Sequence, residues 1–142
     1  MVKQISVFIQ NRAGKIASIV KALSAANVDI RALSIADTAD FGILRMLVND
    51  VETAKATLSL QNCIVSVNEV ALVAVPDEPG GLSHILELLS QEGVDIEYMY
   101  SLIQRGKDKA YMVLRVSDEK KFLEMLSKHG MESVHAQDLG LY

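Results

Sequence analysis

Residues 77–82 read Asp77-Glu78-Pro79-Gly80-Gly81-Leu82 and stand between an apolar run and a segment with helical spacing. The segment Asn11-Arg12-Ala13-Gly14-Lys15-Ile16 occupies the same place earlier in the chain. The offset between these two segments also carries Val28-Asp29-Ile30 onto Val94-Asp95-Ile96. Self-similarity at a fixed period indicates that one structural unit occurs twice.

Each copy predicts the same order of strands and helices. In the first copy, Ile5, Val7 and Ile9 alternate with more polar residues, which predicts a half-buried strand, and apolar residues at helical spacing follow between 15 and 26. The remaining elements of the first copy are strands at 30–35, 43–48 and 63–67 and a helix from residue 50 to about 60. The second copy repeats them with strands at 70–75, 96–104, 110–116 and 134–142 and helices that begin near 82 and 118.

The order β-α-β-β-α-β, found twice, predicts an α+β fold. It consists of two ferredoxin-like βαββαβ units, with antiparallel sheets and helices on one face. No disordered linker separates the copies, so we place the two domains at residues 1–69 and 70–142.

The composition argues against several classes of function. Half of the residues are hydrophobic and 23% are charged, with 14 basic and 18 acidic residues, which is ordinary globular composition without the basic excess of a nucleic-acid binder. The single cysteine, Cys63, excludes an intrachain disulfide and a multi-cysteine metal site. No apolar run is long enough to cross a membrane, and the first residues lack the pattern of a signal peptide. We therefore expect a cytoplasmic protein without metal or cofactor that binds neither nucleic acid nor membrane.

The turn at 77–82 offers groups that suit a free amino acid. Gly80 and Gly81 have no Cβ, so a ligand can approach the backbone closely. The N–H groups at the start of the following helix suit a carboxylate, and we assign those of Gly80, Gly81 and Leu82 to it. The carboxylates of Asp77 and Glu78 suit an ammonium group. The alternative is that Pro79 and the two glycines only form a tight turn between a strand and a helix.

The chain resembles the ACT domain family of small regulatory modules, present here in tandem. The resemblance covers nearly the whole chain and rests on the D-x-P-G-x-L pattern of residues 77–82 and on the residues that follow it, namely Ile85, Leu89, Gly93, Val94, Asp95 and Ile96. It implies units that bind an amino acid or a similar effector near this turn, at an interface between two such domains. The ligand-binding residues that it implies are Asp77, Glu78, Pro79, Gly80, Gly81, Leu82, Val94, Asp95 and Ile96.

The first copy departs from this pattern. Asn11 stands in the place of Asp77, Ala13 in the place of Pro79 and Lys15 in the place of Gly81. We therefore expect the better site at 77–82 and a weaker second site in the first copy. The residues of this weaker site are Asn11, Arg12, Ala13, Gly14, Lys15, Ile16, Val28, Asp29 and Ile30.

These observations together predict a non-catalytic regulatory protein that binds a free amino acid. We expect it to form a homodimer and to act through its assembly or through contact with a partner enzyme. One alternative is a structural protein–protein interaction module without a small-molecule ligand. Another is a small-molecule enzyme, for which Asp77 and His84 are the only candidate acid–base pair. No nucleophile–base pair occurs, so no catalytic residue is assigned.

Overall fold

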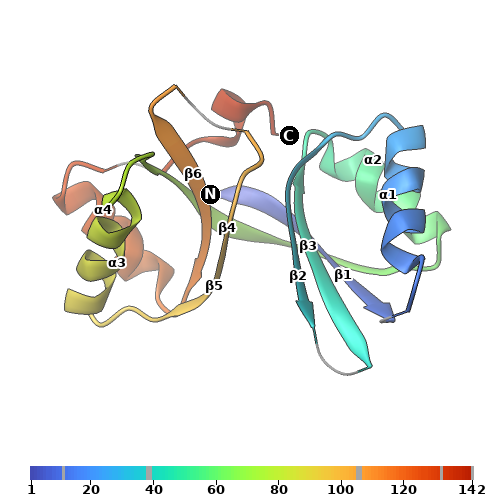
Figure 1. Cartoon of the computed structure of the whole chain (residues 1–142), viewed down its shortest axis with the longest axis horizontal. Helices are drawn as coiled ribbons and strands as arrows, with labels where there is room; N and C mark the ends of the chain where they lie inside the picture. Colours follow the sequence, from blue (N-terminus) through green and yellow to red (C-terminus); the bar gives the residue numbers. More distant parts are fainter. Residues whose placement is uncertain (11, 38–39, 105–106, 132, 142) are drawn as a thin grey trace. The chain divides into compact units, whose positions relative to one another are not determined.

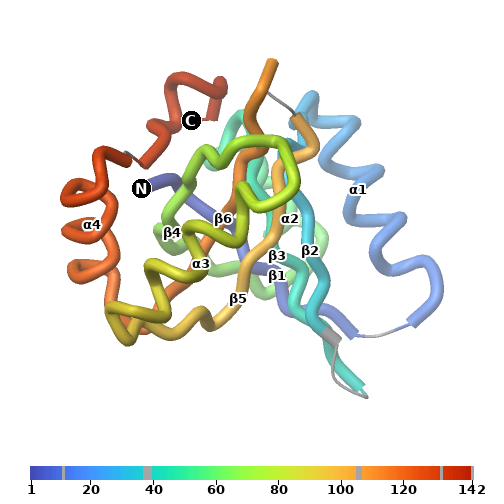
Figure 2. Tube along the Cα trace, turned by 60° about the vertical axis from the view of Figure 1, so that its left-hand side comes forward, coloured from blue at the N-terminus to red at the C-terminus, as the bar shows by residue number. Residues whose placement is uncertain are grey.

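The computed structural model describes residues 1–142 except 11, 38–39, 105–106, 132 and 142. Its elements are β1 (Val2–Gln10), α1 (Lys15–Ala25), β2 (Ile30–Asp37), β3 (Phe41–Val48), α2 (Val51–Leu60), β4 (Ile64–Pro76), α3 (Gly81–Gln91), β5 (Ile96–Ser101), β6 (Lys109–Val116), α4 (Glu119–Lys128) and the 3₁₀ helix η1 (Ala136–Leu139). Figure 1 labels the elements, and Figure 2 traces the chain from its blue start to its red end.

The chain forms two compact units, and each unit includes a short terminal segment from the other end of the sequence. The N-terminal unit consists of Lys3–Glu69 and Ala136–Tyr142, and the C-terminal unit consists of Val70–His135 and Met1–Val2. Strand β4 therefore begins in the N-terminal unit and ends in the C-terminal unit. The assignment of residues 1–69 and 70–142 to two domains stays a prediction.

The strands form an antiparallel sheet in the order β2-β3-β1-β4-β6-β5. In the N-terminal unit, β3 pairs with both β1 and β2. In the C-terminal unit, β6 pairs with both β4 and β5. The register shifts at the same place in both copies, between Ile30 and Ala32 and between Ile96 and Tyr98. The predicted α+β fold of two ferredoxin-like units is confirmed.

The helices of each unit cover one face of its strands, as Figure 1 shows. In the N-terminal unit, the β1 residues that were predicted to alternate inward pack against Ile19 and Leu23 of α1 and Leu58 of α2. In the C-terminal unit, Phe122 of α4 and Ile85 of α3 are fully buried in one cluster with residues of β4 and β6. Burial of these apolar stripes stabilises the helices, because helices of this length are marginal in isolation.

The ends of the helices also repeat. Left-handed residues close all four helices, namely Asn27, Asn62, Gly93 and Gly130, with φ between 58° and 67°. Such a C′ residue allows the next N–H groups to bond back to the last turn, as Val28 does to Leu23 at 2.9 Å. The predicted helix ends at Asn27, Gly93 and Gly130 agree with this geometry.

Three details of the predicted elements are wrong. The strand predicted at 96–104 is shorter and ends at Ser101. The strands predicted at 63–67 and 70–75 form one continuous strand, β4, because no Gly, Pro or turn sequence separates them. The strand predicted over 134–142 is absent from the described residues of that range, where Val134 donates one hydrogen bond to the Leu72 carbonyl and η1 follows. Gly140, with φ 64°, reverses the backbone there, and Leu139 and Leu141 become buried. The predicted loop at 37–40 and turn at 105–108 fall partly outside the described residues.

Candidate functional site

The turn at 77–82 connects β4 to α3 through a left-handed glycine. The N–H of Asp77 donates to the Asp108 carbonyl at 3.0 Å, which ties the start of the turn to the residue before β6. Gly80 adopts φ 90° and ψ −13° and precedes the first helical residue, Gly81. A residue with a side chain adopts this backbone conformation only with strain, so glycine suits position 80.

Gly81 is needed for a different reason, which is packing. A Cβ at this position would lie 2.0 Å from the carbonyl oxygen of Pro76. The N–H of Gly81 donates to the Glu78 carbonyl at 3.0 Å and so closes the turn on itself. This N–H, which we assigned to a ligand carboxylate, is therefore engaged by the turn. Within the described part of the chain, no side chain caps α3.

The four helices begin in two different ways. Asp50 and Asp118 cap α2 and α4, with each carboxylate accepting a backbone N–H at 3.0 Å. Helices α1 and α3 instead begin after the left-handed glycines Gly14 and Gly80, and no side chain of the described residues caps them. Gly14 and Gly80 are both exposed to solvent. In these two helices no described side chain therefore competes with an anion for the N–H groups of the first turn, although the N–H groups of Lys15 and Gly81 themselves donate within the turn.

The turn of the first copy keeps this backbone geometry with different side chains. Gly14 has φ 83° and ψ −10°, and the N–H of Lys15 donates to the Arg12 carbonyl at 3.3 Å. Arg12 and Ala13 are exposed, whereas Lys15 and Ile16 are half-buried. Asn11, predicted to belong to the weaker site, lies outside the described residues.

The predicted strand positions do not meet the predicted turn within one unit. Pro76 pairs with Lys109 at one end of β6, and Ile96 pairs with Val116 at the other end. Lys109 and Val116 are seven residues apart on the extended strand β6, which places the end of β4 and the start of β5 about 23 Å apart. The same holds in the N-terminal unit, where Gln10 pairs with Phe41 and Ile30 with Val48 at opposite ends of β3.

The residues at the start of β2 and β5 have structural partners in both copies. The N–H of Asp95 donates to Oγ of Ser117 at 3.0 Å, and the N–H of Asp29 donates to Oδ1 of Asn49 at 2.8 Å. Val28 and Val94 are buried, whereas Asp29 and Asp95 are exposed. The Asp29 carboxylate also lies 3.4 Å from the guanidinium of Arg31.

The family model described as "ACT domain pair" matches residues 1–141. The chain belongs to the ACT domain family. The predicted resemblance is therefore confirmed over nearly its whole length.

Solved structures share the fold of this ACT domain pair. Protein BT0572 from Bacteroides thetaiotaomicron is 37% identical, with a TM-score of 0.88 over 98% of this chain and 95% of the other. The ligand-free regulatory subunit of aspartate kinase from Thermus thermophilus is 12% identical, with a TM-score of 0.65 over 89% of this chain and 90% of the other. Aspartate kinase from Synechocystis is 21% identical, with a TM-score of 0.59 over 94% of this chain and 26% of the other. No curated protein sequence matches this chain.

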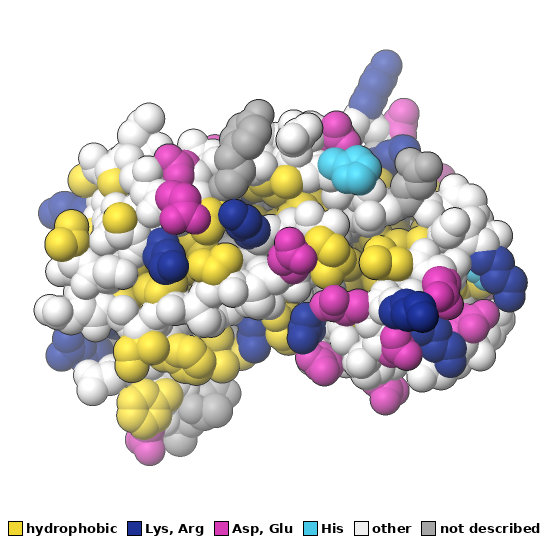
Figure 3. Space-filling model, turned by 180° about the vertical axis from the view of Figure 1, so that it is seen from behind, with side chains coloured by type: hydrophobic (Ala, Val, Ile, Leu, Met, Phe, Trp, Pro, Cys, Tyr) yellow, Lys and Arg dark blue, Asp and Glu magenta, His cyan; other side chains and the backbone are white. Residues whose placement is uncertain are grey.

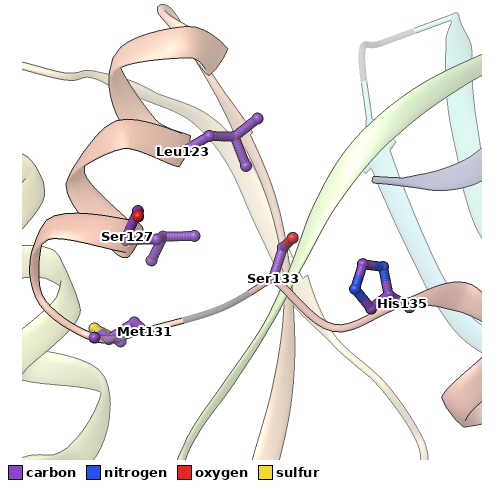
Figure 4. A pocket seen from close by; sticks show the side chains of 7 residues that line it. Leu123, Ser127, Met131, Ser133 and His135 are labelled. Carbon is purple, nitrogen blue, oxygen red and sulfur yellow. The ribbon is translucent and has the colours of Figure 1, made fainter.

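Two of the pockets formed by the described residues of the ACT domain pair were not predicted as such from the sequence. One, of about 340 Å³, lies in the C-terminal unit between α4 and the segment that follows it. Figure 4 shows Leu123 and Ser127 on α4, Met131 beyond it, and Ser133 and His135 on the segment that leads to η1. None of the residues of the 77–82 turn lines this pocket.

The second pocket, of about 350 Å³, lies in the N-terminal unit beside the turn that ends at Lys15. Its lining includes three exposed apolar side chains, Phe8, Phe41 and Ile64, which come from three neighbouring strands. A sequence pattern reveals such a grouping only when the strand order is known, because the three residues are far apart in the chain.

The ACT domain pair shows no sign of a metal centre in the part that the structure describes. No three His, Cys, Asp or Glu residues of that part come together as a metal site would require. Asp77 and His84, the candidate acid–base pair, are both exposed to solvent. Among the described residues, no helix combines the length and the apolar character needed to cross a membrane.

Proposed function

We propose that this ACT domain pair is a non-catalytic regulatory protein that binds a free amino acid at the 77–82 turn. The observation that carries the proposal is the start of α3, where a left-handed glycine precedes an uncapped helix in a protein of the ACT family. The Thermus thermophilus protein of similar fold is named a regulatory subunit, and we extend that kind of role to this chain.

The chemistry of the turn suits both charged groups of an amino acid. The ligand carboxylate would accept N–H groups at the start of α3, where the helix dipole favours negative charge. Asp77 and Glu78, both exposed at this turn, would accept the ligand ammonium. Gly80 leaves open space on its Cα side, since no atom lies within 4 Å of a Cβ built there.

A complete site needs more than one ACT domain. The start of β5, Val94 to Ile96, lies about 23 Å along the sheet from the turn of the same unit. If both segments contact one ligand, they must come from different domains. We therefore propose a homodimer in which a second copy completes the site. Ligand binding would then alter the assembly or its contact with a partner enzyme, and we place the protein in the cytoplasm.

The first test is a thermal-unfolding screen of the protein against all twenty amino acids, followed by calorimetry. A ligand that binds only the folded state adds about 2.7 kcal/mol of stability at 100 times its dissociation constant. We expect one or two amino acids to raise the melting temperature by several degrees.

Asp77→Ala should weaken this effect, because it removes an acceptor for the ligand ammonium. The matched control is Glu124→Ala, which removes the same charge from an exposed position on α4 and should leave the effect unchanged. An unchanged melting temperature across all twenty amino acids would refute the amino-acid sensor.

The alternative is a protein–protein interaction module without a small-molecule ligand. It is favoured by the edge strand β2, where Leu33 is 39% and Ile35 is 47% exposed. Edge strands with exposed apolar side chains pair readily with another chain. Sedimentation would separate the two proposals, since an interaction module would assemble to the same extent with and without every amino acid.

A further inference from the structure

Among its described lining residues, the pocket of the N-terminal unit combines an apolar wall with one cation. We call it the Lys15 pocket. Its volume of about 350 Å³ lies at the lower end of the range for small-molecule sites, about 300–1,000 Å³. All of its described lining residues belong to the N-terminal unit.

The apolar wall consists of Phe8, Phe41 and Ile64. These side chains are 49%, 59% and 70% exposed, and they lie on β1, β3 and β4, which are neighbours in the sheet. Figure 3 shows hydrophobic side chains, in yellow, gathered over the β2–β3 end of this unit. A grouped exposure of large apolar side chains around a hollow is typical of a binding surface.

The cation is Lys15, the first residue of α1. Its side chain is half-buried and lines the pocket. Among the residues that the structure describes, none forms an ion pair with its ammonium group. An anion in the pocket would therefore gain a charge-assisted hydrogen bond without displacing an existing partner.

The remaining polar groups of the pocket are neutral. Gln10 and Asn62 contribute amides, and Cys63 contributes a thiol. None of the described lining residues carries a carboxylate, so the pocket offers no counter-charge for an ammonium group. The turn at 77–82 differs in this respect, because it carries Asp77 and Glu78 and has Gly81 where Lys15 stands.

We propose that the Lys15 pocket binds an apolar carboxylic acid that lacks an ammonium group, such as an aryl or branched-chain acid. The carboxylate would lie at Nζ of Lys15 and the apolar part against Phe8, Phe41 and Ile64. This inference rests on the proposed role of the chain as a small-molecule sensor. It assigns to the two units two ligand classes, an amino acid at the 77–82 turn and a deaminated acid at the Lys15 pocket.

The test compares three ligands of one shape by calorimetry on the full chain. Phenylacetate has the carboxylate alone, phenylglycine adds an ammonium group, and phenylacetamide has no charge. We expect phenylacetate to bind at least about tenfold more tightly than the other two, since a hydrogen bond to a charged group contributes about 1.5–3 kcal/mol. Titration with 4-methylpentanoate extends the test to a branched chain.

Two lysine variants show whether Lys15 supplies the charge. Lys15→Gln should weaken phenylacetate binding by about tenfold and leave phenylacetamide binding unchanged. Lys21→Gln, which removes the same charge from an exposed position on the same helix, should change neither.

The single cysteine of the chain reports where the ligand binds. Cys63 lines the pocket and is half-buried. Saturating phenylacetate should slow its alkylation by the neutral reagent iodoacetamide several-fold, and phenylacetamide at the same concentration should not. The Lys15→Gln protein should lose this protection.

Several results would overturn the proposal. These are equal affinity for phenylglycine, an unchanged affinity in Lys15→Gln, unprotected Cys63, or no binding of either acid at millimolar concentration. Asp77→Ala is titrated in parallel to separate this proposal from the amino-acid sensor. Loss of amino-acid binding in that variant with unchanged phenylacetate binding would show that the two sites are independent.

Discussion

The structure requires glycine at positions 80 and 81 for two different reasons. Gly80 has a left-handed backbone with open space around it, whereas a Cβ on Gly81 would collide with the backbone of Pro76. We expect Gly80→Ala to lower the free energy of unfolding by about 1 kcal/mol through strain alone. Gly81→Ala should cost more, about 2–3 kcal/mol, because a carbonyl oxygen of β4 must move.

Urea denaturation of the two alanine variants measures this difference. Gly93→Ala serves as a control for strain, since Gly93 is also left-handed and has no atom within 4 Å of a Cβ. Its loss should match that of Gly80→Ala. A smaller loss for Gly81→Ala than for Gly80→Ala would contradict the packing argument.

The sequence predicted some of these residue roles and not others. Gly93 and Asn27 follow helical patterns, and their place at the C-terminal ends could be predicted from the preference for left-handed residues there. The role of Gly81 could not, because it depends on how closely α3 approaches the end of β4. The pattern D-x-P-G-x-L therefore indicated the turn, while its second glycine proved to be needed for packing.

Helix α2 offers a test of electrostatics at a helix start. The Thr53 hydroxyl donates to Oδ2 of Asp50 at 2.6 Å and the Thr53 N–H donates to Oδ1 at 3.0 Å, and together they hold the pKa of Asp50 below its ordinary value of 3.8. A lowered pKa in the folded state stabilises the protein when the carboxylate is ionised. This contribution is complete well above pH 3.8 and is lost as the pH falls through the folded-state pKa.

Comparison with Asp50→Asn isolates the charge, because asparagine also caps helices. We expect the wild-type protein to unfold at a higher temperature than the variant at neutral pH. The difference should shrink as the pH falls below 3.8 and through the lowered folded-state pKa of Asp50, because the aspartate is then neutral like the asparagine. A difference that grows at low pH would show that the sign of this argument is wrong.

The strands and helices were predicted well wherever a periodic pattern lay between two turn signals. β1, β2, β3 and all four helices are of this kind. The end of the chain was not, because Val134, Leu139 and Leu141 fit a strand pattern as well as they fit a 3₁₀ turn that buries two leucines. The burial of Leu139 and Leu141 determined the structure of this segment, and the local sequence does not predict that burial.

The return of residues 136–141 to the N-terminal unit is a property of the molecule as a whole. Leu139 is 6% exposed, and its carbonyl accepts a hydrogen bond from the Arg31 guanidinium at 2.9 Å. We expect Leu139→Ala to lower the free energy of unfolding by about 2–3 kcal/mol, as for a buried leucine. Leu60→Ala, at a position that is 83% exposed, should change it by less than about 0.5 kcal/mol.

Denaturant unfolding measures both leucine variants. Hydrogen exchange then shows where stability is lost, and protection should fall around β2, which contains Arg31. Equal losses for Leu139→Ala and Leu60→Ala would mean that the docked segment contributes nothing to stability.

The candidate site stays a prediction. The turn at 77–82 was inferred from its residue types, and the resemblance added 94–96, which in the same unit lies at the other end of the strands. The direction of the strands places the two segments at opposite ends of the sheet. A sequence motif does not show that direction. For the Lys15 pocket, the sequence predicted a weaker site at the turn that contains Lys15 but not the apolar wall, since Phe8, Phe41 and Ile64 become neighbours only in the sheet.

The C-terminal segment that belongs to the N-terminal unit also matters during biosynthesis. A ribosome releases Glu69 long before Leu139 and Leu141, although all three belong to the N-terminal unit. At translation rates of about 5–20 residues per second, this unit waits roughly 4–14 seconds for its last segment. During that interval the place later covered by Leu139 and Leu141 is open to other nascent chains and to chaperones. The order of synthesis thus makes the N-terminal unit the first to start folding and the last to finish.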